Sequence, residues 1–154
     1  VSVGERESVG QVAESCFRWS RFHLDPRIPN DVANLVKRRW VESYVDGSRG
    51  DALYVAHREI RPVGFLAAMR TIDENGEIAV IDLIGVDPNF HGQGIGQALV
   101  RQFEEDYLNG GCRLGVGTQA ANPSSIRFYE SQGFRFSRSE YVLHAHCEDG
   151  IVIT

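Results

Sequence analysis

The chain has 154 residues, 42% of them hydrophobic and 24% charged, and its formal net charge at pH 7 is −5. This length and composition indicate one folded domain with its own core rather than a disordered segment. The acidic balance excludes a broad nucleic-acid-binding face, which needs a basic surface, and no apolar run approaches the roughly 18 residues of a membrane span.

The three cysteines, Cys16, Cys112 and Cys147, are far apart and odd in number. This usage indicates free thiols in a reducing compartment, and because the N-terminus carries no signal-like segment we expect a cytoplasmic protein. The first residue is Val1 and not Met, so we expect residues 1–154 to be a single domain, either trimmed or the C-terminal part of a longer chain.

The first part of the chain predicts two helices. Apolar residues at helical spacing indicate one helix over residues 7–17. A second apolar stripe indicates another, which begins at a cap residue, Asn30 or Asp31, and ends near Gly47. The aromatic and basic stretch between them contains two prolines, which exclude a long helix there.

Three strands are predicted next, over residues 52–58, 62–71 and 77–86. The Asn75-Gly76 pair is a strong signal for a tight turn between the second and the third strand. These strands are therefore expected to form consecutive hairpins.

The second half of the chain alternates between helix and strand. It predicts a helix over residues 94–108, a strand over 112–119, a helix over 122–133, and two final strands within 134–146 that are separated by a bend at 137–139. The elements follow the order α-α-β-β-β-α-β-α-β-β, which indicates one mixed α/β sheet.

The helix over residues 94–108 connects two strands of this sheet. A helical crossover joins parallel strands, so we expect the strands around residues 80–86 and 114–118 to be parallel, and to splay at their C-terminal ends.

The stretch DPNFHGQGIGQAL, residues 87–99, leads from a strand into this helix and carries Gly92, Gly94 and Gly96. Its G-x-G-x-G spacing does not match the G-x-G-x-x-G of dinucleotide-binding loops, and Gln97 replaces the lysine of a phosphate-binding Walker loop. A glycine-rich turn at a helix N-terminus can still bind an anion through its backbone N–H groups. The alternative is a tight turn without a ligand.

The segments LIGVDPNFHGQGIGQAL and NPSSIRFYESQGF together resemble the GNAT superfamily of acetyl-CoA-dependent N-acetyltransferases, over about Ala52 to His144. In that family the pattern [RQ]-x-x-G-x-[GA] binds the pyrophosphate of coenzyme A. Gly94 and Gly96 match its glycine positions, while His91 stands where Arg or Gln is usual. The resemblance implies a splayed GNAT-like sheet whose short first strand is cut off at Val1–Val3, and acetyl-CoA as the co-substrate.

The resemblance also implies which residues contact acetyl-CoA. The strand end at Ile84, Gly85 and Val86 would offer main-chain groups to pantetheine, with the Val86 N–H directed at the thioester oxygen; the alternative is an ordinary buried strand. The complete expected set is Ile84, Gly85, Val86, His91, Gly92, Gln93, Gly94, Ile95, Gly96, Gln97 and Asn122.

Two residues are candidates for acid–base chemistry. Tyr129 follows Asn122 by two helical turns, so both can face one cleft. The resemblance implies that Tyr129 is the general acid toward the departing thiolate; the alternative is a core tyrosine. Asp82 shares a strand face with Ile84 and Val86 by alternation, and could deprotonate the amine or be a capped or solvent-facing carboxylate.

The acceptor is expected to bind at the stretch FRWSRFHLDPRIP between the first two helices, which selects acceptors in this family. Its aromatic residues can stack on bases or sugars and its arginines can pair with phosphate. The region resembles bacterial dTDP-fucosamine N-acetyltransferases, a likeness that continues through TQAANPSSIRFYESQGF. The predicted acceptor-binding residues are Arg18, Trp19, Arg21, Phe22 and Gln119.

Three functional interpretations stay open: acetylation of a nucleotide-linked amino sugar, acetylation of another amine such as a protein N-terminus, a polyamine or an antibiotic, and non-catalytic acyl-CoA binding. His144 and His146 share a strand face, but no further ligand has a suitable spacing, so no metal is expected. The sequence does not set the oligomeric state, and a homodimer is one option.

Overall fold

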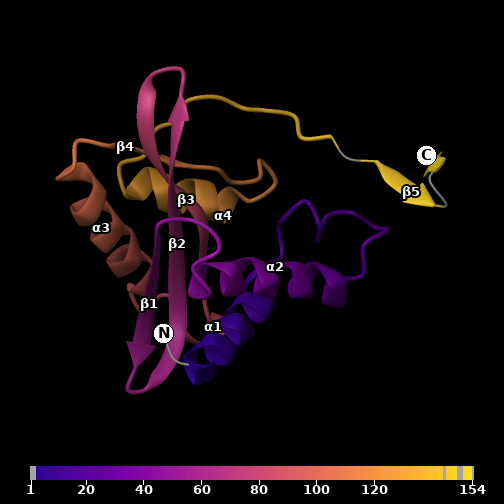
Figure 1. Cartoon of the computed structure of the whole chain (residues 1–154), viewed down its shortest axis with the longest axis horizontal. Coiled ribbons are helices and arrows are strands. Elements are labelled where there is room, and N and C mark those ends of the chain that lie inside the picture. Colours follow the sequence, from indigo (N-terminus) through magenta and orange to yellow (C-terminus); the bar gives the residue numbers. More distant parts are fainter. Residues whose placement is uncertain (1–2, 144, 149–150, 154) are drawn as a thin grey trace.

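The computed structural model of the chain describes residues 3–143, 145–148 and 151–153 (Figure 1). Two helices precede three antiparallel strands, after which helices and strands alternate. The elements are α1 (Val3–Cys16), α2 (Asn30–Val45), β1 (Ala52–Arg58), β2 (Arg61–Asp73), β3 (Gly76–Val86), a short 3₁₀ turn (Pro88–Phe90), α3 (Ile95–Leu108), β4 (Arg113–Val116), α4 (Pro123–Ser131), β5 (His146–Glu148) and β6 (Ile151–Ile153).

The main sheet has the strand order β1-β2-β3-β4, with β1, β2 and β3 antiparallel to their neighbours and β4 parallel to β3. Only residues 78–81 of β3 pair with β4, although β3 continues to Val86. The predicted parallel, splayed pair is therefore confirmed, and no described strand pairs with the last residues of β3 on that side.

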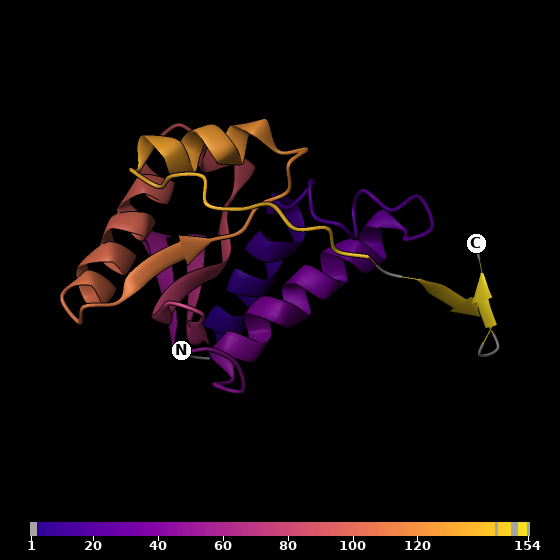
Figure 2. The same cartoon turned by 90° about the horizontal axis from the view of Figure 1, so that it is seen from above.

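Helices cover both faces of this sheet. In Figure 1 α3 lies on one side of the strands, and α1 and α2 lie on the other. Val9 and Val41 of the first two helices pack with Phe65 and Leu83 in one fully or almost fully buried cluster. A second cluster joins α3 and α4 to the opposite face and includes Phe103. Figure 2 shows α4 lying beside α3, close to the end of the sheet where β3 and β4 part.

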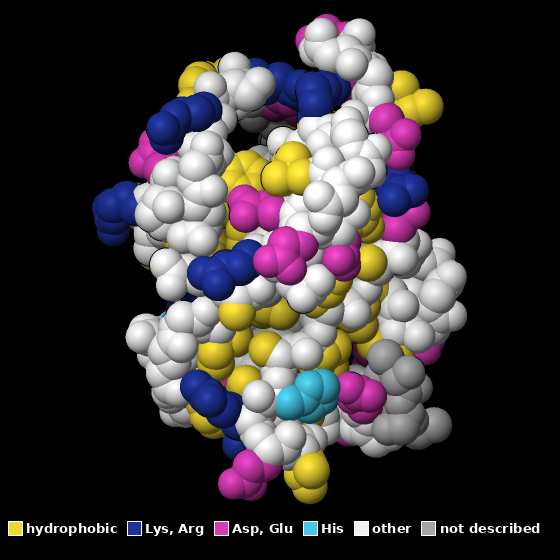
Figure 3. All heavy atoms as spheres, turned by 90° about the vertical axis from the view of Figure 1, so that its left-hand side faces the viewer, with side chains coloured by type: hydrophobic (Ala, Val, Ile, Leu, Met, Phe, Trp, Pro, Cys, Tyr) yellow, Lys and Arg dark blue, Asp and Glu magenta, His cyan; other side chains and the backbone are white. Residues whose placement is uncertain are grey.

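The face that carries α3 shows hydrophobic side chains among scattered basic and acidic ones (Figure 3). Neither sign of charge forms a continuous field on this face. This mixture is typical of the surface of an ordinary globular domain.

A β-bulge lies at Asp82. The pairing of β2 with β3 runs Ala67↔Leu83 and then Ala68↔Ile81, so Asp82 is the extra residue on the longer strand. A bulge breaks the alternation of side chains. Asp82 therefore faces α2, whereas Ile84 and Val86 pack on the cluster beneath α3. The prediction that these three residues share a face is wrong for this reason.

The C-terminal strands also differ from the prediction. Residues 134–143 form no strand, and the hairpin lies further on, as β5 and β6. The alternating pattern that indicated strands is present, but Phe136 and Tyr141 are 81% and 98% exposed and contact no neighbouring strand. A period-2 pattern shows that residues suit a strand, not that a partner strand lies beside them.

Smaller corrections concern the first two helices. Pro29 precedes α2 without a side-chain cap, and the Asp31 carboxylate accepts a hydrogen bond only from the adjacent Val32 N–H among the described contacts. Val3 is the first residue of α1 and not part of a strand; the rest of the expected Val1–Val3 strand lies outside the described residues.

Neither metal-binding nor membrane-spanning features occur in the described part of the chain. Among residues 3–143, 145–148 and 151–153, no group of three His, Cys, Asp or Glu side chains is placed to hold a metal ion, and His144 lies outside this set. None of the helices within these ranges has the length and apolar character needed to cross a membrane.

Candidate active site

A cavity of about 770 Å³ lies beside the unpaired end of β3. It brings together the end of α1, the segment that follows it, the glycine loop and the start of α4. Its walls are formed by Cys16, Arg18, Trp19, Ile84, Gly85, Val86, Pro88, Phe90, His91, Gly92, Gly94, Ile95, Gly96, Gln97, Asn122, Ser124, Ser125, Phe128 and Tyr129.

The glycine loop bends sharply before α3. Gly92 and Gly94 have φ angles of +73° and +77°, the left-handed region that side chains other than glycine rarely adopt. A Cβ on Gly92 would meet nothing within 4 Å, so this part of the loop is open. Gly96 serves a different purpose, because a Cβ there would lie 3.3 Å from the Phe128 ring. The third glycine therefore allows α4 to pack closely against α3.

The N-terminus of α3 presents unused hydrogen-bond donors. The first intrahelical hydrogen bond runs from Ala98 N–H to the Gly94 carbonyl, and no side chain caps the helix. The N–H groups of Ile95, Gly96 and Gln97 precede that bond and have no intrahelical partner, and these three residues line the cavity. Free N–H groups at the positive end of a helix dipole favour an anion, and these residues therefore fit a pyrophosphate.

The end of β3 has free backbone groups on its open side. Asp87 N–H donates to the Val63 carbonyl of β2 at 2.8 Å. Successive N–H groups of a strand point to opposite sides, so the N–H groups of Val86 and Ile84 point away from β2 into the gap beside β4. His91 steadies this end, because its Nε2 donates to the Val86 carbonyl at 2.9 Å. An extended, amide-containing ligand arm could pair with this edge as a strand does.

Tyr129 lies at the inner wall of the cavity and is 8% exposed. Its ring packs against Phe128 and Phe134, with centroids 5.3 and 5.9 Å away. Burial raises the pKa of its phenol to about 12, so the hydroxyl is protonated at neutral pH. Within the described part of the chain no side chain or backbone group accepts a hydrogen bond from it. The hydroxyl is thus a free proton donor at the cavity.

Asn122 caps α4 as the N-P sequence predicts. Its Oδ1 accepts a hydrogen bond from Ser125 N–H at 3.2 Å, and its Nδ2 donates to Ser125 Oγ at 2.7 Å. Ser124 Oγ also donates to Asn122 Oδ1. All three residues line the cavity.

Asp82 is engaged outside the cavity. Its Oδ2 accepts hydrogen bonds from Trp40 Nε1 at 2.8 Å, Tyr44 Oη at 2.6 Å and Arg49 Nε at 2.8 Å. Burial alone would raise the pKa of Asp82, but these hydrogen bonds and the Arg49 charge outweigh it and lower the pKa below its ordinary value. A carboxylate held in this way is a weak proton acceptor.

Several other predicted residues do not line the cavity. Gln93 accepts a hydrogen bond from Arg58 at 3.3 Å, which directs its side chain toward β1. Gln119 uses its carbonyl to accept from Asn122 N–H. The Arg21 guanidinium lies over the Phe22 ring at 4.8 Å. Of the predicted acceptor residues, Arg18 and Trp19 therefore reach the cavity.

The sequence interpretation missed Cys16, Pro88, Phe90, Ser124, Ser125 and Phe128, which also form its walls. Ser124, Ser125 and Phe128 belong to the motif NPSSIRFYESQGF, so the motif itself carried a signal for them. Cys16 carried none, because only the packing of α1 on β3 brings its sulfur against Gly85.

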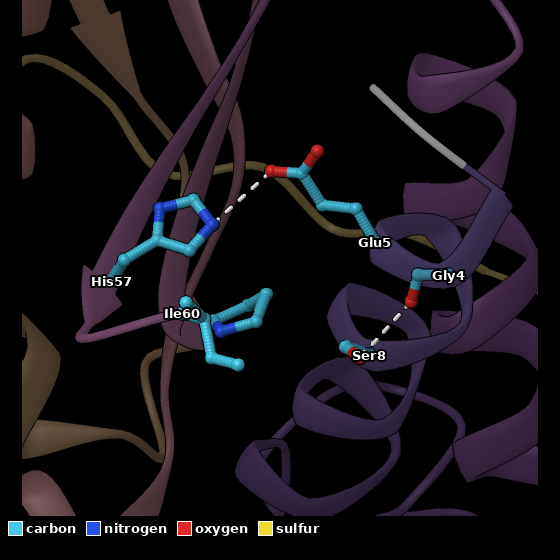
Figure 4. A pocket seen from close by; sticks show the side chains of 6 residues that line it. Gly4, Glu5, Ser8, His57 and Ile60 are labelled. Carbon is cyan, nitrogen blue, oxygen red and sulfur yellow. Dashed lines mark hydrogen bonds and ion pairs between the residues drawn. The ribbon is translucent and has the colours of Figure 1, made fainter.

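A second hollow of about 410 Å³ lies between α1 and the turn that joins β1 to β2. Figure 4 shows His57 directed toward Glu5 there, with 3.1 Å between Nε2 and Oε1. None of the predicted site residues lines this hollow.

Comparison with known proteins identifies the domain to which this cavity belongs. Residues 10–134 match the acetyltransferase (GNAT) family. The chain belongs to this family. Its fold is that of an acetyltransferase domain, and acetyl-CoA is the acetyl donor that the family uses.

Curated relatives include the spore coat polysaccharide biosynthesis protein SpsD of Bacillus subtilis, 30% identical over 142 residues that cover 92% of this chain and 47% of the relative. The N-acetylaspartate synthetase of Danio rerio is 32% identical over 114 residues, 73% of this chain and 38% of the relative. The chain spans less than half the length of these two relatives.

Solved structures support the fold. Aminoglycoside N-acetyltransferase AAC(6')-Iy in complex with CoA aligns with a TM-score of 0.64 at 19% identity, over 96% of this chain and 92% of that chain. A transcriptional regulator from Bacillus halodurans C-125 aligns with a TM-score of 0.66 at 22% identity, over 94% and 95% of the two chains. The expected GNAT-like mixed sheet is confirmed.

Proposed function

We propose that this domain transfers acetyl from acetyl-CoA to the amino group of a nucleotide-linked amino sugar. The observation that carries the proposal is the single cavity shared by the open N-terminus of α3, the free edge of β3, the Tyr129 hydroxyl and two residues of the acceptor segment, Arg18 and Trp19. The proposed acetyl-CoA site and the proposed acceptor site would therefore adjoin each other beside the Tyr129 hydroxyl.

The donor half of the cavity would hold acetyl-CoA by its backbone. The N–H groups of Ile95, Gly96 and Gln97 would bind the pyrophosphate oxygens, and Ile84 and Val86 would pair with the pantetheine amides. The Val86 N–H is suited to polarise the thioester carbonyl, because a fixed donor stabilises negative charge that develops on that oxygen. Asn122 and its serine neighbours supply further polar contacts.

Tyr129 would act as the general acid. When the amine nitrogen bonds to the acetyl carbon and the carbon–sulfur bond breaks, the Tyr129 hydroxyl gives its proton to the thiolate sulfur. Its raised pKa of about 12 keeps the Tyr129 phenol protonated at neutral pH, so the proton is available at the moment the thiolate leaves.

Asp82 receives a positioning role in this proposal. Its three hydrogen bonds fix Trp40, Tyr44 and Arg49 on the acceptor side of the sheet, and its lowered pKa does not suit the deprotonation of an ammonium group. The proposal assigns no dedicated general base, so the acceptor amine would lose its proton to water.

The choice of a nucleotide-linked sugar rests on Arg18, Trp19 and the similarity to a protein of polysaccharide biosynthesis. An arginine can pair with phosphate, and an aromatic ring can stack on a base or a sugar. Both side chains belong to the segment between α1 and α2, opposite the glycine loop.

Release of the coenzyme A thiol from acetyl-CoA tests the proposal. We expect turnover with dTDP- or UDP-linked amino sugars, and an Arg18→Ala variant with a raised acceptor KM and a nearly unchanged kcat, since a remote phosphate contact binds ground and transition states alike. Good turnover of a peptide or a polyamine beside none of any nucleotide-linked sugar would assign the other acceptor class. No turnover of any amine would leave acyl-CoA binding as the function.

The proposal also places the domain in the cytoplasm. The thiols of Cys16, Cys112 and Cys147 are free, which suits a reducing compartment. Whether two copies associate is a matter for light scattering on the purified domain, in which a homodimer would give twice the monomer mass of 17.2 kDa.

A further inference from the structure

Lys37 is the single lysine among the 154 residues, and the other basic side chains, histidines aside, are arginines. It lies on the inner face of α2 and is 7% exposed. Lysine side chains are almost never fully buried unless they are paired with a carboxylate. The position therefore calls for an explanation.

Aromatic rings enclose the Lys37 ammonium. Its Nζ lies 4.5 Å from the ring centre of Trp40, 4.9 Å from that of Phe17 and 6.0 Å from that of Phe22. Two of these rings belong to the acceptor segment between α1 and α2. Cation–π contact of this kind favours a charged amine over a neutral one.

The ammonium has no anionic partner in the described part of the chain. No carboxylate oxygen of these residues lies within 4 Å of Nζ, and no hydrogen bond is formed there either. The carboxylate that influences it most is Asp82, whose Oδ2 already accepts three hydrogen bonds. Arg21 adds a second positive charge nearby, and none of the described carboxylates forms an ion pair with it.

The nitrogen at the tip of this side chain is nevertheless not completely buried. Among the described residues, every fully buried side-chain nitrogen has a hydrogen-bond partner. Because Lys37 Nζ has none, it is not sealed from solvent, although its carbon stem is covered. A small part of the ammonium is therefore in contact with solvent, although the residue as a whole is 7% exposed.

Lys37 is connected to the cavity through Cys16, which lines its wall. Its charge acts on Cys16, and the Cys16 sulfur packs against Gly85 at the splayed end of β3. Neither cation lines the cavity itself. Both lie against the segment between α1 and α2, over Phe22 and Phe17, and Arg18 and Trp19 of the same segment do line the cavity.

We propose that Lys37, together with Arg21, binds an anionic group of the acetyl acceptor, with Phe17, Phe22 and Trp40 holding the ammonium in place. Two like charges close together are costly without an anion, and an arriving phosphate or carboxylate removes that cost while it gains charge-assisted hydrogen bonds. The acceptor is then an amine that carries its own negative charge. This inference rests on the proposed acetyltransferase function.

Binding of an anion to protein saturated with coenzyme A tests the inference, because the pyrophosphate site is then occupied. One arm titrates dTDP and the other succinate, which distinguishes a phosphate from a carboxylate. We expect one of them to bind, and Lys37→Met, which keeps the length of the side chain, to weaken that binding about 10- to 100-fold. Lys37→Arg should recover part of it.

The controls separate a binding role from a structural one. Arg39→Met removes a charge from the exposed side of α2 and should leave anion binding unchanged. Lys37→Met should unfold at the same or a higher temperature than the native protein, because it replaces an unpaired buried charge by an apolar chain of similar shape.

Chemical labelling gives an independent readout, since Lys37 supplies the only side-chain amine. The anion that binds should protect it from an amine-reactive reagent. Absence of binding in both arms, or equal affinity in Lys37→Met and Arg39→Met, would overturn the inference. Failure of acetyl transfer with anion binding still dependent on Lys37 would instead count against the proposed function alone.

Discussion

At the scale of single residues, Tyr129 carries the clearest chemical prediction. Replacement by phenylalanine keeps the ring contacts with Phe128 and Phe134 and deletes only the hydroxyl. If that hydroxyl protonates the leaving thiolate, kcat should fall by roughly 10²- to 10⁴-fold, the usual contribution of a general acid. Steady-state kinetics with acetyl-CoA would measure kcat, and calorimetric titration would measure the affinity for coenzyme A. The affinity should hardly change, because the ring contacts are kept.

Tyr107→Phe is the matched control for this change. Tyr107 is 4% exposed and belongs to the same hydrophobic cluster, but it lies at the far end of α3 and does not line the cavity. Its loss of a hydroxyl should leave kcat at the wild-type value. A Tyr129→Phe enzyme as fast as the Tyr107→Phe enzyme would contradict the general-acid role.

Substitution of Gly94 can distinguish a loss of anion binding from a loss of stability through backbone strain, because Gly111 offers a matched control. Its φ of +77° is nearly the same as the +76° of Gly111, which lies in the turn after α3. Alanine at either position should destabilise the fold by about 1–2 kcal/mol, the cost of a left-handed conformation for a residue with a Cβ. Only Gly94→Ala should also weaken acetyl-CoA binding, because only this glycine shapes the N-terminus of α3.

Calorimetric titration beside thermal unfolding of both variants measures the two effects independently. Equal losses of acetyl-CoA affinity in Gly94→Ala and Gly111→Ala would mean that general strain, and not the shape of the loop, governs binding.

At the scale of helices and strands, the packing of α1 on α2 depends on a buried carboxylate. Glu42 is 1% exposed and forms ion pairs with Arg6 at 3.2 Å, Arg38 at 2.8 Å and Arg39 at 3.1 Å. Glu42→Gln leaves three guanidinium groups without their common partner. We expect the free energy of unfolding to fall by about 1–3 kcal/mol, the cost of removing one partner from a buried polar contact.

Urea unfolding of Glu42→Gln measures this loss, with Glu105→Gln on the exposed face of α3 as the control. The acetyl-CoA affinity of folded Glu42→Gln should be unchanged, since Glu42 does not line the cavity. Equal stability of the two variants would remove the ion-pair cluster as a cause of the α1–α2 contact.

The sequence located the elements well where the signal is local. Turn residues and periodicity placed β1, the β2–β3 hairpin and α3 within a few residues of their observed bounds. The orientation of Asp82 could not be predicted in this way, because a bulge is a property of a strand and its partner together. For the same reason residues 134–143 suited a strand although none of the described strands pairs with them.

In the candidate site, too, residues within local motifs could be predicted from the sequence, and residues brought together only by packing could not. The glycine loop, Asn122 and Tyr129 lie in short motifs, so their place at one cavity follows from two stretches of sequence. The burial of Lys37 could not be predicted from a motif, because in the sequence it is simply one charged residue of a predicted helix. Only the packing of the acceptor segment against α2 reveals that it is buried and unpaired.

At the scale of the whole molecule, acid should destabilise this fold through several carboxyl groups at once. The pKa values of Glu42 and Asp82 lie below their ordinary values, because hydrogen bonds and positive charges outweigh the effect of burial. Hydrogen bonds lower those of Asp46 and Asp73 as well, through Arg6 and through the Asn75 N–H. The charged form of each of these four carboxyl groups therefore stabilises the folded protein relative to the unfolded chain.

A lowered pKa in the folded state means that the unfolded chain binds more protons in acid. The stabilisation is therefore complete above the ordinary carboxyl values of 3.8 for Asp and 4.5 for Glu, and is lost as the pH falls through the lower folded values. We expect the free energy of unfolding, measured by urea at a series of pH values, to be steady near neutrality and to decline below about pH 5. Asp82→Asn should show a shallower decline than the native protein, because asparagine cannot titrate but still occupies the space between Trp40, Tyr44 and Arg49. An unchanged slope in this variant would show that Asp82 has the same pKa in the folded and the unfolded chain, and would contradict the view that three hydrogen bonds hold it in its charged form.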